Sequence, residues 1–202
     1  MKSSVLTVDL ERGFAALELE KRLSDTPTNA HTRGLFFRLA EQALAGRSKE
    51  LVKVWRAASG ARSRWPFLMY PTRDFVREQA VAAVLLDPAD PCGALRRMWA
   101  TTPRLSPLIR AEGFMRYMTG SEPMQALTWL GGNRSMMCDY GDWWVVPGGT
   151  NSATFHYQDE YTWIEHCHVG GVEGTLRRCG VSPVITAELD TPYRGKLLIR
   201  WS

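Results

Sequence analysis

The chain changes character near residue 140, and this change constrains the fold more than any other feature. Up to residue 132, apolar residues recur at helical spacing, as in "TRDFVREQAVAAVLL" over 72–86. From residue 142, short runs of aromatic and β-branched residues such as "DWWVVP" and "ATFHYQ" alternate with turn residues. Helices and strands that are segregated along a chain are typical of the α+β class.

The length of 202 residues suits one domain, and we expect a single domain over 1–202. It should have a flexible tail over 1–8, a mainly helical part over 9–132 and a mainly strand part over 142–202. The helical part should pack on a mostly antiparallel sheet of about five strands, crossed by one helix. We expect the strands at 142–147, 153–158, 161–169, 183–190 and 195–202, and the crossing helix at 173–180.

The composition points to an ordinary cytoplasmic protein. No apolar run approaches the roughly 18 residues that a membrane span needs. The N-terminus has no sustained apolar region and is followed by Asp9 and Glu11, so it does not resemble a signal peptide. The four cysteines form no C-x-x-C pair, which favours reduced and mostly buried thiols.

Charge is unevenly distributed, and this suggests one class of partner. Residues 33–77 hold ten Arg or Lys against three acids, whereas residues 138–190 hold eight acids against two Arg. In "RAASGARSRW" the cations Arg56, Arg62 and Arg64 stand beside Trp65, a combination that suits phosphate contact and base stacking. No recognised DNA-binding motif accompanies them, so a nucleic-acid-associated protein is an alternative and not the first hypothesis.

The stretch "EHCHVGGVEGTLRRCG" over 165–180 contains the residues of a possible metal site. On a regular strand, His166 and His168 share one face, and His156 on the preceding strand could lie across from them. Three imidazoles can bind zinc. The competing interpretation is a polar strand face with hydrogen-bonded histidines, so no metal is expected and the three histidines stay an alternative.

The same stretch could also hold a phosphate or belong to an enzyme. Glycines between a strand and a helix can direct backbone N–H groups at an anion, with Arg177 and Arg178 nearby. However, no complete phosphate-binding motif is present. The common catalytic signatures are also missing. We therefore expect a protein that is not an enzyme and has no cofactor.

Aromatic residues are abundant, with eight tryptophans and eight methionines. The pair Trp143–Trp144 places one ring on each face of its strand, so one ring needs a second cover. A partner, a second copy of the chain or an apolar ligand would provide that cover. The candidate residues for an apolar cavity between helices and sheet are Trp99, Met115, Trp129, Met136, Trp143 and Trp163.

Several segments together resemble a known family. These are "DTPTNAHTRGLFF", "FLMYPTRDFVREQAVAAVLL", "GGVEGTLRRCG", "PVITAEL" and "GKLLIRW", which cover roughly residues 25–201. They resemble a myxobacterial paralogous family of uncharacterised domains, which is similar in outline to haem-nitric-oxide-binding and 4-vinyl-reductase-type ligand domains. The resemblance implies helices followed by an antiparallel sheet with a helix across it, an apolar cavity and possible dimers. It does not extend to haem, because the Tyr-x-Ser-x-Arg motif of the haem-binding domains is absent.

The first hypothesis is thus a non-enzymatic regulatory or sensor-like domain. It would bind a protein partner, a second copy of itself or a small apolar ligand. The alternatives are a nucleic-acid-associated protein that uses Arg56, Arg62, Arg64 and Trp65, and a metal-binding protein or enzyme that uses the three histidines.

Overall fold

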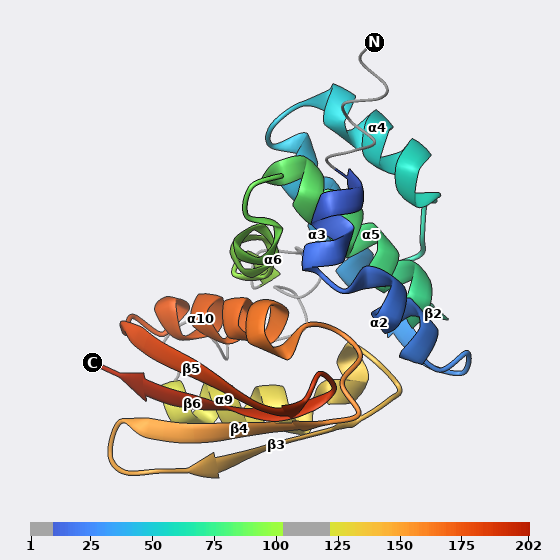
Figure 1. Cartoon of the computed structure of the whole chain (residues 1–202). Helices are drawn as coiled ribbons and strands as arrows, with labels where there is room; N and C mark the ends of the chain where they lie inside the picture. Colours follow the sequence, from blue (N-terminus) through green and yellow to red (C-terminus); the bar gives the residue numbers. More distant parts are fainter. Residues whose placement is uncertain (1–9, 103–121) are drawn as a thin grey trace. The chain divides into compact units, whose positions relative to one another are not determined.

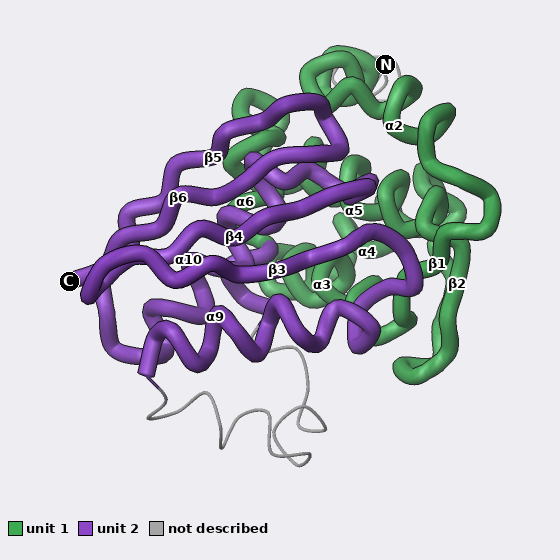
Figure 2. Tube along the Cα trace, turned by 90° about the horizontal axis from the view of Figure 1, so that it is seen from below, with its two compact units in different colours: residues 1–98 green, residues 99–202 purple. Residues whose placement is uncertain are grey.

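In the computed structural model, helices and an antiparallel sheet account for most of the described residues, which are 10–102 and 122–202 (Figure 1). The chain divides into two compact units, residues 1–98 and 99–202, and each is described by itself (Figure 2). The α+β class is confirmed. The predicted tail over 1–8 and a helix predicted over 106–120 lie outside the described residues.

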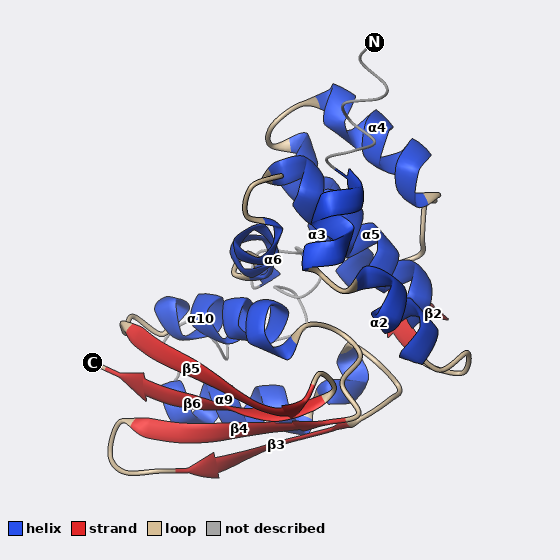
Figure 3. Cartoon of the chain, viewed as in Figure 1, coloured by secondary structure: helices blue, strands red, loops and turns tan. Residues whose placement is uncertain are grey.

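The first unit is helical with one small two-stranded sheet (Figure 3). Its strands pair antiparallel, with Thr32 opposite Tyr70. In chain order its elements are α2 (Leu19–Asp25), β1 (His31–Arg33), α3 (Gly34–Ala45), α4 (Lys49–Ser59), β2 (Met69–Pro71), α5 (Thr72–Leu86) and α6 (Pro91–Trp99), whose last residue, Trp99, already belongs to the second unit.

Helix α5 is the central element of the first unit and has the bounds that the periodicity predicts. Every residue from Glu78 to Val84 is buried, because α2, α3 and α4 all pack against this helix. The Phe37 ring of α3 lies 5.0 Å from the Phe75 ring of α5. Helix α4 also begins as predicted, since the Ser48 side chain accepts a hydrogen bond from the second residue of the helix.

The second unit is a sheet with helices on one face. Its elements are α9 (Pro123–Gly132), a 3-10 turn (Arg134–Met136), β3 (Asp142–Pro147), β4 (Ser152–Gln158), a π-helix (Ile164–His168), α10 (Val169–Arg178), β5 (Pro183–Thr191) and β6 (Arg194–Trp201). The sheet order is β3-β4-β6-β5, and all neighbours are antiparallel.

The two faces of this sheet differ as the alternation of residues requires. Phe155, Tyr157, Leu197 and Ile199 point to one face and form a core with Leu176 and other apolar residues of α9 and α10. The other face is open. One row across it runs Trp144, His156, Lys196, Glu188 in paired register. Trp143 and Trp144 therefore point to opposite faces, as predicted.

The prediction of a strand over 161–169 is wrong. Residues 164–168 form a π-helix that continues directly into α10, which begins at Val169 and not at 173. The carbonyl of Trp163 accepts from the amides of Cys167 at 2.7 Å and His168 at 3.4 Å. Gly170 and Gly171, which suggested a turn, lie inside the helix.

Substitution by alanine should have opposite effects on stability at two glycines of α10. A Cβ at Gly174 would collide with the backbone carbonyl of Ala100, whereas a Cβ at Gly171 would meet Trp99 at an ordinary 3.8 Å. Gly174→Ala should therefore lower the free energy of unfolding by about 1–3 kcal/mol. Gly171→Ala should raise it by about 0.5–1 kcal/mol, because alanine favours the helix. Urea titration of both variants tests this pair, and equal effects would contradict the close approach at Gly174.

Candidate functional site

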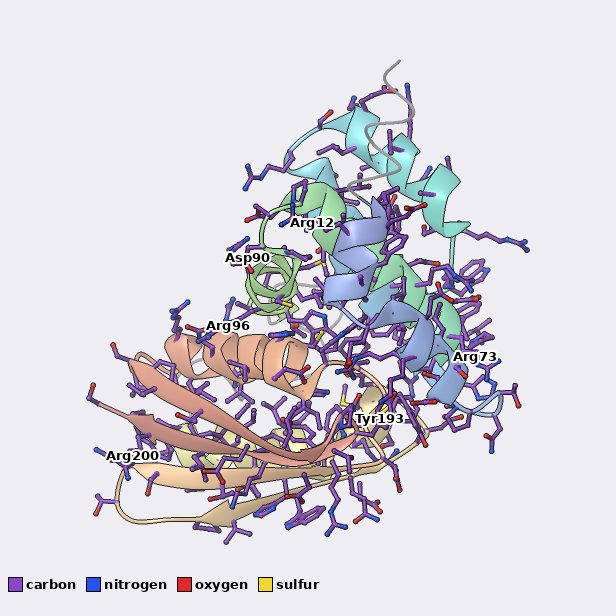
Figure 4. All side chains as sticks on the ribbon, in the orientation of Figure 1. Arg12, Arg73, Asp90, Arg96, Tyr193 and Arg200 are labelled. Carbon is purple, nitrogen blue, oxygen red and sulfur yellow. The ribbon has the colours of Figure 1, made fainter. Side chains whose placement is uncertain are left out.

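The turn after β4 places an acidic side chain in the core of the second unit. Asp159 adopts a left-handed conformation with φ of 53°, and Gly141 leaves room for the carbonyls of Gln158 and Asp159. The next residue, Glu160, donates its amide to the carbonyl of Tyr193 at 2.9 Å. Tyr193 lies in the turn between β5 and β6 (Figure 4). Glu160 is thereby fixed to the hairpin of the neighbouring strands and is fully buried.

Both carboxylate oxygens of Glu160 accept hydrogen bonds. Oε1 accepts from the amide of Thr162 at 2.9 Å and from its hydroxyl at 2.7 Å. Oε2 accepts from Nε1 of Trp143 at 2.9 Å and lies 3.3 Å from Nε2 of His168. The Thr162 hydroxyl oxygen is 3.0 Å from the same nitrogen. Because that hydroxyl donates to Glu160, its oxygen is the acceptor toward an N–H of His168.

Two opposing effects set the charge of Glu160. Burial alone would raise the pKa of this carboxyl. The charge of His168 and the hydrogen bonds from His168 and Thr162 outweigh burial and hold the pKa below its ordinary value of 4.5. Glu160 is therefore an anion at neutral pH, and it needs its donors to remain one.

Aromatic rings enclose the partner of this carboxylate. The ring of His168 lies 4.9 Å from Trp143, 4.4 Å from Tyr157 and 5.5 Å from Trp99. His168 is only 5% exposed. We call these three rings with His168 and Glu160 the aromatic cluster. The cluster combines mainly apolar rings with a few fixed polar groups, a composition that small-molecule sites share.

The cluster contains some of the residues predicted for an apolar cavity. Trp99 and Trp143 both meet the His168 ring, and the fully buried Trp163 supplies the carbonyl that begins the π-helix. Trp129 lies on α9 and Met136 in the 3-10 turn, each half-buried. Met115 lies outside the described residues.

Sequence reasoning missed Glu160, Thr162 and Tyr157. The pair "DE" over 159–160 is typical of a turn between strands, and nothing in its composition indicates burial. The spacing Ile164, His168, Val172, Leu176 was an available signal for His168, since a step of four residues marks one helical face.

The predicted grouping of three histidines is wrong. His156 lies on the open face of the sheet, where its ring stacks on Trp144 at 4.9 Å. His168 packs against Trp143 and Tyr157, whose side chains point to the opposite face. The sheet itself separates the two imidazoles. In residues 10–102 and 122–202, no three His, Cys, Asp or Glu side chains come together as a metal-binding group.

The phosphate alternative fails for a related reason. The glycines of "HVGGVEG" lie within α10, and the amide of His168 at its start already donates to Trp163. Arg177 is paired with Glu173. No strand-to-helix turn is present there to direct amides at an anion.

The predicted nucleic-acid residues do not form one surface. Arg64 is buried, with 7% of its side chain exposed, and pairs with Glu78 at 2.6 Å. Its guanidinium also lies 3.9 Å from the centre of the Phe37 ring. Arg56 is paired with Glu41, while Arg62 and Trp65 are exposed. Arg64 thus stabilises the first unit and is not available to a phosphate backbone.

A cysteine nucleophile is also disfavoured. Burial and, to a smaller extent, the nearby charge of Glu160 raise the pKa of Cys138 to about 12. The reactive species of a cysteine is the thiolate, which this thiol does not form near neutral pH.

A known family matches most of the chain. The family is described as "Protein of unknown function (DUF2378)", and its match covers residues 27–202. The chain belongs to the DUF2378 family. The family description does not name an organism, so the myxobacterial origin stays a prediction. No curated protein matches the chain significantly.

Solved structures share the fold of this DUF2378 protein. An Fe(II) unliganded H-NOX protein from K. algicida is similar with a TM-score of 0.68 at 15% identity, over 84% of this chain and 96% of that one. A point mutant of the H-NOX protein from T. tengcongensis is similar with a TM-score of 0.66 at 14% identity, over 84% of this chain and 97% of that one. An H-NOX protein from S. oneidensis in the Fe(II)NO ligation state has a TM-score of 0.66 at 10% identity, over 84% of this chain and 99% of that one. These likenesses show a common fold.

The likeness raises the question of haem, which one related H-NOX structure names in its description. A histidine-ligated haem needs a ring nitrogen that can reach the iron. All four histidines lie in the described residues. Nε2 of His168 is engaged by Glu160 and Thr162, and His156 is stacked on the open sheet face. His31 lies in β1, and His166 is half-exposed on the π-helix. The arrangement therefore engages Nε2 of His168 within the aromatic cluster and places the His156 ring against Trp144.

Proposed function

We propose that this DUF2378 protein is a cytoplasmic, non-enzymatic, sensor-like domain that binds a small apolar ligand at the aromatic cluster. The observation that carries the proposal is the buried carboxylate of Glu160, which faces Nε2 of His168 among three aromatic rings. A buried carboxylate gives little net stability compared with apolar residues of similar volume. Its presence in an apolar core therefore favours a role in recognition.

Two further features support the proposal. The cluster is built on a π-helix, an irregularity that is frequent at functional sites. The fold is shared with H-NOX proteins, one of which was solved in an Fe(II)NO ligation state.

In the described residues, no helix is long and apolar enough to cross a membrane.

The proposal extends to signalling through a partner or a second copy of the chain. Ligand binding would act on the π-helix, because Trp99 and Trp143 contact the ring of His168 at its end. That the two units act as one domain is part of this proposal. Analytical ultracentrifugation with and without ligand tests the pairing of two copies, which should change with ligand.

The neutral dye Nile red tests the apolar site directly. The full chain should bind it saturably with a rise in fluorescence. Trp143→Leu should weaken binding at least tenfold, because Trp143 contacts both Glu160 and His168. The matched control is Trp144→Leu, the next residue on the open face of the sheet, which should bind as the wild type does. Equal losses in both variants, or no saturable binding by the wild type, would overturn the proposal.

A further inference from the structure

The first unit contains a groove of about 330 Å³ that the aromatic cluster does not share. Helices α3, α4 and α5 and the segment over 62–64 line it. Phe37 and Trp55 line it and are nearly fully buried. A volume of this size suits a small molecule.

The wall carrying Arg62 is fixed in place. Amides at the start of α3 donate to the loop between α4 and β2: Gly34 to the carbonyl of Leu68 at 2.8 Å, and Leu35 to that of Pro66 at 2.9 Å. Any side chain at Gly34 would collide with the carbonyl of Trp65. The loop is therefore held close to α3, and the groove is a built feature of the unit.

The charges of the groove are unbalanced. Four arginines and two glutamates line it. Arg64 pairs with Glu78 and Arg56 with Glu41. The guanidinium groups of the other two, Arg38 and Arg62, form no ion pair with any residue that the structure describes. The groove therefore has an excess of positive charge, which favours an anion.

A buried oxygen in the same groove lacks a partner. Glu78 is 1% exposed, and its Oε1 accepts from Arg64. Its Oε2 is buried and has no hydrogen-bond partner among residues 10–102 and 122–202. An unpaired buried carboxylate oxygen costs free energy, which a donor group on a ligand would recover.

We propose that this groove binds a small organic anion, a phosphate or a carboxylate, that also carries a hydroxyl or amino group. Arg38 and Arg62 hold the anionic group, and Oε2 of Glu78 accepts from the donor. The inference does not rest on the apolar site, because it concerns other residues and a ligand of opposite character.

Isothermal titration calorimetry of the full chain with sodium phosphate, glycerol 3-phosphate and glycerate tests this site. Glycerol 3-phosphate or glycerate should bind saturably at millimolar or lower concentration. Arg38→Gln and Arg62→Gln should each weaken binding about tenfold, the effect of losing one charge-assisted hydrogen bond. The matched control is Arg77→Gln, an exposed arginine of α5 outside the groove, which should bind as the wild type does.

The arms of the experiment separate the parts of the proposal. Tighter binding of glycerol 3-phosphate than of inorganic phosphate supports the donor to Glu78, and equal affinities overturn that part. No saturable binding of any probe, or equal weakening in the Arg77→Gln control, overturns the site. If Arg38→Gln does not fold, Arg62→Gln decides alone, because Arg62 is exposed and its substitution leaves the core intact.

Discussion

Replacing His168 by leucine should lower the free energy of unfolding by about 3–5 kcal/mol. The physical reason is that Glu160 would remain a buried carboxylate without the ring nitrogen of His168 that faces its Oε2. The hydrogen bonds from Trp143 and Thr162 would persist but would not compensate the charge. Chemical denaturation monitored by circular dichroism measures the loss.

A second substitution distinguishes this cause from a packing defect. In the His168→Leu background, Glu160→Gln should recover about 1–3 kcal/mol, because the amide removes the uncompensated charge and keeps an acceptor oxygen. The control is His156→Leu on the open sheet face, which should change stability by less than about 1 kcal/mol. If the effects of His168→Leu and Glu160→Gln simply add, the loss arises from packing and not from the ion pair.

The second large effect concerns Glu78 and pH. The pKa of this carboxyl is raised from 4.5 to about 7, because burial and, to a smaller extent, the charges of Asp74 and Glu41 outweigh the lowering effect of Arg64. The folded protein therefore holds this proton more tightly than the unfolded chain. Stability from this group is constant below about pH 4.5, falls as the pH rises to about 7, and is constant again above.

The fall should amount to about 3 kcal/mol, since each unit of pKa corresponds to about 1.4 kcal/mol. Subtracting the stability of Glu78→Gln from that of the wild type at each pH isolates the contribution. The same substitution at the exposed Glu50 is the control for the chemical change itself. A flat difference for Glu78→Gln would mean that Arg64 keeps Glu78 ionised throughout. Glu160 acts in the opposite sense, because its lowered pKa contributes stability that is lost as the pH falls below about 4.5.

Local signals in the sequence predicted the helices well. Helix α5 has its predicted bounds, and Ser48 and Gly60 limit α4 as expected. The side chain of Asp90 accepts the amide of Gly93 at 2.8 Å and so fixes the start of α6. These features depend on periodicity and capping, which act within a few residues and are visible in one chain.

The strand part was predicted less well where packing decides the structure. Strands β3 and β4 alternate as expected, and Trp143 and Trp144 separate correctly. The residues of "YTWIEHCHV" have β propensity, but this preference depends on the surface against which they pack. Here Ile164 of the π-helix and Val172 of α10 pack into the same core, and the helical arrangement prevails.

The candidate site could be predicted only in part. Trp99 and Trp143 followed from the search for large apolar residues near the junction of helices and sheet. Glu160 did not, because a single acid after a strand usually faces solvent. Likewise, the partnerless oxygen of Glu78 depends on where Arg64 points, which is a property of the folded unit.

Native mass spectrometry of the purified chain tests the central claim most directly. The wild type should carry a small apolar molecule above the 22.8 kDa of the chain, and denaturation should release it. Trp143→Leu should lose this additional mass, whereas Trp144→Leu should keep it. A wild-type protein that has the mass of the bare chain under native conditions would contradict the account.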